Sequence, residues 1–520
     1  LFDTPRLAAQ ESLITKFAKN GEAKEADARL QKLARTYPDA YRPWIASARL
    51  ALEQGDTEGA VEALVEAGVR GADLQQALGG EIFGPLAGHP SLQAAGKDVR
   101  APSPAPKPHL IKGAEAPVTA DACGWNAALA RIHCAYTFAP AMKRLPLFGD
   151  QRFKSERLET LVRRGFAAGN VGDIYDNLDA AHSILRRREP TQLTFAVYGP
   201  AAQNARLHYG VNEHMMFDAI VFGNSSTALT GKHWRSQARG ALTTQDGPAR
   251  LWQLYRANHI YVFPEHRDHD PPGGKGKGDV FPANTPYYIV SQGSSGSDLQ
   301  FVRAIRNILA ALPTKVKAKL KEAGLIAPTV QKILRRGADW IASDEDYLSG
   351  RAHPTVFKDA PANDRLIDLA QALTLDALPP LATLTLLEMV GDAGALAPEA
   401  LIATPVAIAA MWRGPLGERR YRLKASGEDA NDRPLTYHWR LLRGDPSRVK
   451  IRPLDGEGRE VEISIKWQDD IRTAGDGGLP SGRIDIGLFA HNGAHYSAPA
   501  FFSVSLPRHE TRKYASTGVP

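Results

Sequence analysis

The sequence predicts a multidomain α+β protein with an N-terminal helical repeat, a central α/β domain and a C-terminal β-sandwich. Three observations lead to this fold class: a 34-residue repeat near the start, short apolar runs that alternate with helical patterns in the middle, and strand-like alternation beyond residue 413. At 520 residues the chain exceeds the size at which one core keeps growing, so about two to four domains are expected. We place the segments at residues 1–100, 101–117, 118–413 and 414–520.

Composition and charge argue against a membrane-spanning protein and against a nucleic-acid-binding protein. The chain is 43% hydrophobic and 23% charged, as in ordinary globular proteins. No apolar run reaches the ~18 residues of a membrane-spanning helix, so we expect a soluble protein with no transmembrane segment. The net charge of +7 is spread over 64 basic and 57 acidic residues. Because zinc-finger spacing and RNP-type motifs are absent from the sequence, nucleic acid is not an expected partner.

The N-terminal segment repeats with a period of 34 residues. The matching positions are 19–23 with 53–57, Ala26 with Ala60, and Leu30 with Leu64. Small residues at this spacing resemble about two tetratricopeptide repeats over residues 7 to 70. Two repeats are too few for an independent solenoid, so we expect them to pack on the body or to dock a protein partner. The proline-rich stretch 101–108 then predicts a stiff, extended linker.

In the body, four apolar runs each stop at polar or turn-forming residues. They are Leu193 to Tyr198, Ala219 to Phe222, Ile260 to Phe263 and Tyr287 to Val290. Helical patterns follow at 299–312 and 316–334, which favours a mainly parallel α/β sheet. We expect the runs that end at Phe222, Phe263 and Val290 to be neighbouring strands pointing the same way. The loops that follow would then bring Asn224, His266 and Ser294 to the rim of one ligand site.

The first candidate site is the hexad Glu265-His266-Arg267-Asp268-His269-Asp270, directly after a predicted strand. Imidazoles beside carboxylates suit proton transfer, with His266 or His269 as general base and Glu265 or Asp268 as its orienter or the acid. The same side chains suit a divalent metal ion held by His266, His269 and Asp270, although the spacing matches no recognised metal signature. The alternative is a hydrated, salt-bridged loop.

The second candidate is the loop 291–298, which lies between a predicted strand and a predicted helix. Its glycines and the helix N-terminus suit an anion or oxyanion cradle that includes Ser294 and Ser295. The loop matches neither the Gly-x-Ser-x-Gly motif nor a Walker loop. The alternative is a helix cap with Ser297 or Asp298 as the N-cap residue.

The third candidate is the turn 172–183, which is rich in Asp, Asn, Tyr and His and suits hydrogen bonds to sugar hydroxyls. With residues from other loops it forms the predicted substrate-binding set: Asp176, Asn177, His182, Asn224, Ser225, Arg235, Asn284 and Gln292. The alternative is a structural turn, because Asp and Asn side chains commonly bond their own backbone.

The chain has two cysteines, Cys123 and Cys134, which flank a segment that reads as a tight hairpin. Such a pair can reach disulfide geometry if the chain is exported, and the alternative is two half-buried thiols.

Beyond residue 413 the sequence resembles the secreted polycystic-kidney and cadherin-like immunoglobulin-fold modules. The matching residues are an Asp/Asn-rich turn at Asp429, Asn431 and Asp432, then Leu435-Thr436-Tyr437 and Trp439, and later the turn Asn492-Gly493. This resemblance covers residues 415 to 508 and implies an Ig-like β-sandwich.

Residues 118 to 508 as a whole resemble a family of uncharacterised secreted bacterial proteins. The matching strings are 222–227, 264–270, 281–286 and 291–298. The resemblance implies export to the periplasm or the medium and transfers no catalytic residue.

The leading functional hypothesis is therefore an extracytoplasmic hydrolase that acts on a polysaccharide or another cell-envelope or environmental polymer. The rival hypothesis is a non-catalytic ligand-binding or scaffold protein of the cell envelope.

Overall fold

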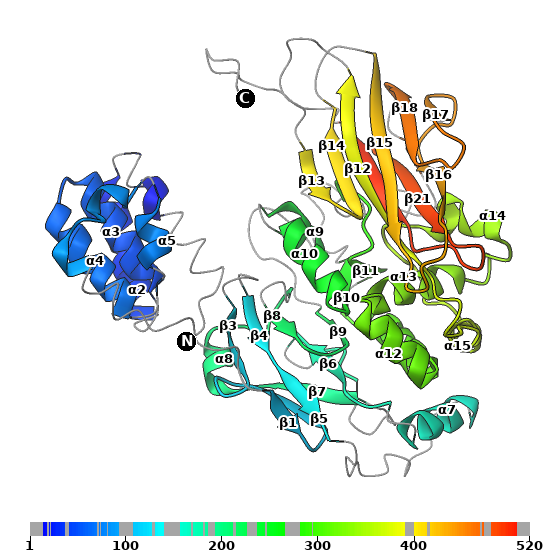
Figure 1. The fold of residues 1–520 in the computed structure, drawn as a ribbon, viewed down its shortest axis with the longest axis horizontal. Coiled ribbons are helices and arrows are strands. Elements are labelled where there is room, and N and C mark those ends of the chain that lie inside the picture. The colour runs from blue at the N-terminus through cyan, green and yellow to red at the C-terminus, as the bar shows by residue number, and fades with distance from the viewer. Residues whose placement is uncertain are drawn as a thin grey trace.

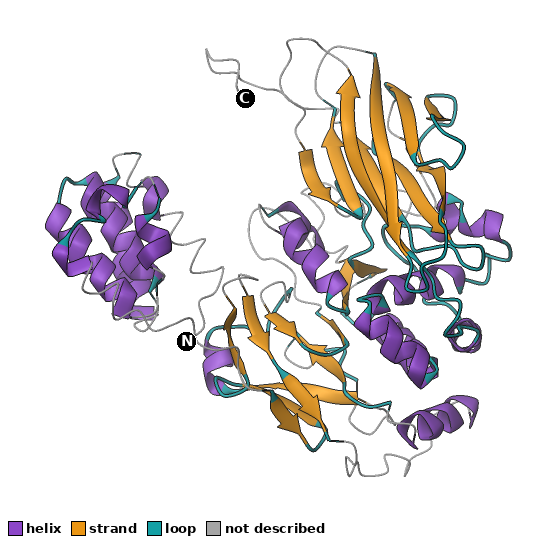
Figure 2. Ribbon diagram, viewed as in Figure 1, coloured by secondary structure: helices purple, strands orange, loops and turns teal. Residues whose placement is uncertain are grey.

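Figures 1 and 2 show the computed structural model of the chain. The structure describes residues 14–17, 20, 22–36, 41–69, 72, 74–80, 82–92, 108–126, 131–139, 156–167, 170–179, 182–185, 193–211, 215–225, 237–244, 247–265, 281–293, 295–390, 400–412, 417–468, 471–472 and 480–506. Within these ranges no helix is long and apolar enough to cross a membrane.

The predicted fold class, a multidomain α+β protein with a helical repeat, a central α/β domain and an Ig-like β-sandwich, is wrong. The structure is a mixed α/β protein whose described strands form six sheets, and only 34% of it is helical. One cluster of buried apolar side chains runs from Ile111 to Leu506, so strands that we assigned to separate modules pack around one continuous core. Hydrophobic periodicity led to the wrong class because it shows which residues are buried but not what they pack against.

The N-terminal helices have small apolar cores of their own. These elements are α2 (Ala23–Thr36), α3 (Arg42–Glu53), α4 (Thr57–Val69), α5 (Leu74–Leu78) and η1 (Gly84–Leu86). Helix α3 contacts both α2 and α4, and the repeat-related Ala26 and Ala60 are fully buried. The tetratricopeptide identity stays a prediction, because residues 1–13 and 37–40 lie outside the described part.

The body contains a six-stranded sheet in the order β11-β10-β9-β6-β7-β2. Its strands are β2 (Glu115–Val118), β6 (Asp173–Asn177), β7 (Leu193–Tyr198), β9 (Val221–Asn224), β10 (His259–Glu265) and β11 (Tyr288–Gln292). All neighbours in this sheet pair in parallel. The prediction that the runs ending at Phe222, Phe263 and Val290 are neighbouring parallel strands is therefore confirmed.

The strand order reverses between β6 and β9. From β6 the chain adds β7 on one side, then returns to add β9, β10 and β11 on the other side. In open α/β sheets such a switch point leaves room beyond the carboxyl ends of the two strands, and ligands bind there. The topology thus indicates that a ligand site would lie at the carboxyl ends of β6 and β9.

Helices α10 (Gly247–Arg256), α11 (Leu299–Ala311) and α13 (Ile326–Arg336) all contact β10. The predicted helix over 316–334 is two helices, α12 (Thr314–Glu322) and α13. The break falls at Gly324, where φ is +65° and an added Cβ would lie 2.5 Å from the carbonyl oxygen of Arg256. The other helices are α7 (Glu156–Ala167), α8 (Pro200–Asn204), α9 (Gln237–Thr243), α14 (Asp344–Tyr347), η3 (Gly350–Ala352) and α15 (Asn363–Gln371).

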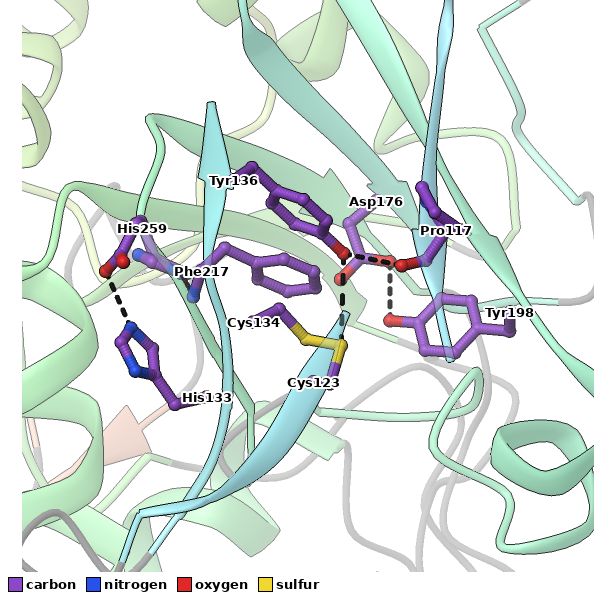
Figure 3. The surroundings of a disulfide bond; sticks show 10 residues. Pro117, Cys123, His133, Cys134, Tyr136, Asp176, Tyr198, Phe217 and His259 are labelled. Atoms are coloured by element: carbon purple, nitrogen blue, oxygen red, sulfur yellow. Dashed lines mark hydrogen bonds and ion pairs between the residues drawn. A yellow bond between two sulfur atoms is a disulfide. The ribbon is translucent and has the colours of Figure 1, made fainter. Parts of the chain in front are cut away.

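Two small sheets accompany the parallel sheet. One joins β1 (His109–Ile111) to β5 (Tyr136–Phe138), and the other orders β3 (Cys123–Asn126), β4 (Arg131–Cys134) and β8 (Met215–Phe217). Strands β3 and β4 pair in antiparallel register with Cys123 opposite Cys134, and a disulfide joins these buried residues. In Figure 3 the ring of Tyr136 lies beside this disulfide.

The C-terminal strands form two larger sheets. One has the order β12-β15-β18-β17 and the other β13-β14-β22-β21-β16, and β12 and β15 of the first contact β21 of the second. The strands are β12 (Leu381–Val390), β13 (Ala400–Thr404), β14 (Ala407–Met411), β15 (Glu418–Glu428), β16 (Thr436–Arg443), β17 (Val449–Pro453), β18 (Glu460–Lys466), β21 (Ile484–His491) and β22 (Ala500–Ser505), with a short pair β19 (Ile471–Arg472) and β20 (Pro480–Ser481) beside them. In β15 buried and exposed residues alternate, as expected for a strand with one face in the core.

Buried hydrogen bonds tie these C-terminal sheets to the body. Arg483 donates to the carbonyl oxygen of Phe281 across 2.7 Å and to Thr355 across 2.6 Å, while its guanidinium pairs with Asp485. Strands on both sides of residue 413 belong to the same sheets, because β12 pairs with β15 and β14 pairs with β22. The body and the C-terminal sheets are therefore held together by buried polar contacts as well as by the shared apolar core.

Candidate functional site

Four neighbouring parallel strands end in polar residues at one edge of the sheet. Asn177 ends β6, Asn224 ends β9, Glu265 ends β10 and Gln292 ends β11. Asn177 lies opposite Asn224 in the register, and Glu265 lies opposite Gln292. The structure thus brings together four of the residues that the sequence predicts for the site.

At the switch point these residues join a hydrogen-bond network, which we call the switch-point cluster: Tyr175, Asn177, Asn224 and Asp298. The amide of Asn224 donates to the carboxylate of Asp298 across 2.6 Å, and its carbonyl oxygen accepts from the hydroxyl of Tyr175 across 2.7 Å. Asn177 donates to the same carbonyl oxygen of Asn224 across 3.4 Å. Since Tyr175, Asn224 and Asp298 are fully or almost fully buried, the network holds the ends of β6 and β9 and the start of α11 rigidly together.

Asp298 gives the cluster an ionisable group. Burial raises the pKa of its carboxyl group, while hydrogen bonds from the Asn224 amide and the Gly296 backbone N–H oppose that rise. It precedes the first residue of α11 and accepts the backbone N–H of Gly296 across 3.1 Å. Asp298 therefore occupies the N-cap position of α11, as in the helix-cap alternative, but its side chain forms no capping hydrogen bond with the helix.

Other predicted binding residues lie close to the cluster. His182 has an exposed side chain 3.5 Å from the Asp179 carboxylate, and its carbonyl oxygen accepts from Asn177 across 2.8 Å. Ser225 is buried and its hydroxyl donates to the carbonyl oxygen of Leu178. Ser295 is exposed in the turn before α11. His182 and Ser295 are accessible to a ligand, whereas the Ser225 hydroxyl is buried and hydrogen-bonded to the backbone.

Glu265 has a partner that the sequence does not indicate. Its carboxylate forms an ion pair with Arg239 of α9, and both side chains are almost fully buried. The guanidinium of Arg239 also lies 4.7 Å from the centre of the Phe281 ring. Because the Glu265 carboxylate is paired and buried, its role is to hold α9 against β10, and it is poorly suited to proton transfer.

Asp176 is buried in a second polar group of the same sheet. It accepts hydrogen bonds from the hydroxyls of Tyr198 across 2.8 Å and Tyr261 across 2.9 Å, and Figure 3 shows Tyr198 pointing toward it. Burial, followed by the charge of Asp176, raises the pKa of the Tyr198 phenol well above its ordinary value. These contacts give Asp176 a structural role as the acceptor for two buried phenols.

The structure does not bring Asn284 to this edge. Asn284 precedes β11 at its amino end, where its amide donates to the carbonyl oxygen of His353 and its N–H donates to Ser503 of β22. The other predicted residues lie outside the described residues: His266, Asp268, His269, Asp270, Ser294 and Arg235. In the part of the chain that is described, no three His, Cys, Asp or Glu side chains are grouped so that they could hold a metal ion.

Sequence reasoning missed Tyr175 and Arg239 and treated Asp298 only as a cap. The signal for Asp298 was its position after a glycine-rich loop at the start of a helix. No local pattern marks Arg239, because its partner lies 26 residues away in the chain.

The chain was compared with models of known protein families, with curated proteins and with solved structures, and no match was found in any of the three comparisons.

Proposed function

We propose that the chain is an extracytoplasmic hydrolase that acts on a polysaccharide or another polymer of the cell envelope or the environment, at the carboxyl edge of β6, β9, β10 and β11. The observation that carries the proposal is the position of the switch-point cluster, where Asn177, Asn224 and Asp298 meet at the reversal of the strand order. Doubly wound sheets bind ligands at this place.

The chemistry of the edge supports hydrolysis. The edge holds the carboxyl group of Asp298, whose pKa is raised by burial, and carboxyl groups with a raised pKa are common at acid/base sites. His266, Asp268 and His269 follow Glu265 directly in the chain and remain the proposed proton-transfer residues. Amide and hydroxyl groups at the edge, including those of Asn177 and Ser295, suit recognition of sugar hydroxyls.

The disulfide supports an extracytoplasmic location. Disulfides persist in oxidising compartments and are rare in the reducing cytosol. The bond between Cys123 and Cys134 is buried in the core of the body and closes the β3–β4 hairpin. We also propose that the N-terminal helices bind a protein partner.

A divalent metal ion at His266, His269 and Asp270 is a further part of the proposal. Imidazole and carboxylate ligands suit zinc, iron or manganese. Elemental analysis of the purified protein by mass spectrometry, before and after treatment with a chelator, tests it directly. A stoichiometric metal that is lost in His269→Ala would support the site, and a metal-free active protein would contradict it.

A second candidate function is ligand binding without turnover. It is favoured by the hydrogen bonds that join Asn224 to Tyr175, Asn177 and Asp298, because they hold the ends of β6 and β9 in one fixed arrangement, as in a preformed binding site. Where both partners are described, no hydrogen bond at this edge joins a serine hydroxyl to a histidine.

One experiment separates the two functions. Purified protein is incubated for a long period with a panel of neutral and acidic polysaccharides, and both the release of reducing ends and equilibrium binding are measured. Release of reducing ends from one polymer supports the hydrolase. Binding without release supports the second candidate, and the absence of both would contradict a polymer as the ligand.

A further inference from the structure

Arg335 is a buried cation that does not belong to the switch-point cluster. It lies in the last turn of α13 and only 2% of its surface is exposed. Its guanidinium carbon lies 5.0 Å from the centre of the Phe357 ring and 5.6 Å from that of Phe501 on β22. The residue therefore sits where a helix of the body meets the five-stranded sheet.

The hydrogen bonds of Arg335 leave part of its guanidinium unsatisfied. Its Nε donates to the side-chain oxygen of Gln331 across 3.0 Å. Its Nη1 is buried and finds no acceptor among the described residues. A guanidinium carries five N–H donors and cannot be neutralised by losing a proton at ordinary pH, so unmade hydrogen bonds here are costly.

The titratable groups that act on Arg335 supply no negative charge. Burial raises the pKa values of the Tyr255 and Tyr347 phenols, which are therefore neutral at physiological pH. Burial, followed by the charge of Arg335, lowers the pKa of His353 well below its ordinary value. Asp344 lies on the neighbouring α14, but its carboxylate contacts Arg336. Burial lowers the pKa of Arg335 itself to about 10, so it stays positively charged at neutral pH.

Two features offset only part of the cost of burying this charge. The aromatic faces of Phe357 and Phe501 attract a cation, and the carbonyl end of α13 adds a favourable dipole. Neither replaces a counter-ion, because an isolated buried charge is far more costly than a cation–π contact is favourable. A negatively charged partner would satisfy both the charge and the open N–H group.

We propose that Arg335 is the centre of an internal binding site for a small inorganic anion, and that chloride is the ion that fits it. A single positive charge calls for a monovalent ion, and a side chain that is 98% buried excludes a polymer or a large organic acid. The ion would lie between α13 and β22, so it would strengthen the contact between the body and the C-terminal sheets. This site is independent of the proposed hydrolase site.

The test measures thermal unfolding of the full chain in sodium chloride and in sodium gluconate at equal ionic strength and pH. Chloride that binds only the folded state raises the melting temperature with its concentration, by roughly 1 to 2 °C at about ten times the dissociation constant for a chain of this length. In Arg335→Met the two salts should give the same melting temperature. In the matched control Arg336→Met, which alters the adjacent and partly exposed arginine, the chloride effect should persist.

Equal melting temperatures of the wild-type protein in both salts would overturn the proposal, as would a chloride effect that survives in Arg335→Met. If Arg335→Met does not fold, crystals of the wild-type protein grown in bromide provide the second measurement. An anomalous bromide peak within hydrogen-bond distance of the Arg335 guanidinium supports the site, and its absence in an ordered region refutes it.

Discussion

Asn224, the last residue of β9, donates its side-chain amide to the carboxylate of Asp298 at the start of α11, although 74 residues separate the two in the chain. The bond is 2.6 Å long and both residues are fully buried. It links the strand at the switch point to the helix that follows the last strand of the sheet, and it fixes the geometry of the proposed site.

Replacing Asn224 with alanine should destabilise the protein by about 1 to 3 kcal/mol, because the Tyr175 hydroxyl and the Asp298 carboxyl group each lose a buried partner. Urea unfolding monitored by circular dichroism measures the change. Ser295→Ala, which alters an exposed residue beside the same edge, is the control and should change stability by less than about 0.5 kcal/mol. A neutral Asn224→Ala variant would show that the network does not stabilise the edge.

Breaking the buried ion pair with Arg239→Met should cost about 3 to 5 kcal/mol, because the Glu265 carboxylate is left in the core without its guanidinium. The double variant with Glu265→Gln should recover part of this loss. The matched control is the surface pair Arg452–Glu462, whose arginine side chain is 66% exposed and whose removal should cost about 0.2 to 1 kcal/mol. Equal effects at the two pairs would contradict the buried role of Glu265.

The disulfide should stabilise the folded state by about 2 to 3 kcal/mol, since a short closed loop restricts the unfolded chain. We expect Cys123→Ser with Cys134→Ser to lower the free energy of unfolding by that amount, measured by urea unfolding with the wild-type protein under non-reducing conditions as reference. Thiol titration of the unfolded, non-reduced wild-type protein should detect no free thiol. Two titratable thiols in protein purified from its native compartment would remove the support that the disulfide lends to export.

Stability should fall as the pH drops below about 6.5, and His259 is one identified cause. Burial lowers its folded-state pKa to about 3, and its Nε2 accepts the backbone N–H of Phe217. Between about 6.5 and 3 the unfolded chain therefore binds a proton that the folded chain does not, which costs about 1.4 kcal/mol per pH unit. His259→Gln should reduce the slope of stability against pH by this amount, measured by urea unfolding at several pH values.

The wild-type protein, measured over the same pH range, is the reference for that slope. An unchanged slope in His259→Gln would mean that His259 can be protonated in the folded state.

Local patterns predicted much of the parallel sheet. The apolar runs ending at Phe222, Phe263 and Val290 lie in β9, β10 and β11, and the predicted helix over 299–312 matches α11 within one residue. These features are visible because burial on both faces of a parallel strand imposes a continuous apolar run. Each of the three runs ends two residues before its strand does.

Other features depend on partners that are distant in the chain, and no local pattern reveals them. Arg483 meets Phe281 across 202 residues, and this contact helps to join the C-terminal strands to the body, which the sequence had assigned to separate domains. Asn284 was predicted to bind substrate because its amide suits hydrogen bonds to sugar hydroxyls, yet its partners are His353 and Ser503. Polarity in a sequence does not distinguish a side chain that binds a ligand from one that joins two layers of the core.

The most direct test of the proposed function is the kinetics of Asn177→Ala on the polymer that the wild-type protein degrades. Asn177 is only half-buried, so its replacement should preserve the fold while it removes a polar group from the switch-point cluster. We expect kcat/KM to fall at least about tenfold with little change in melting temperature, whereas Thr383→Ala on the distant β12 should keep full activity. Full activity of Asn177→Ala would contradict a hydrolase site at the ends of β6 and β9.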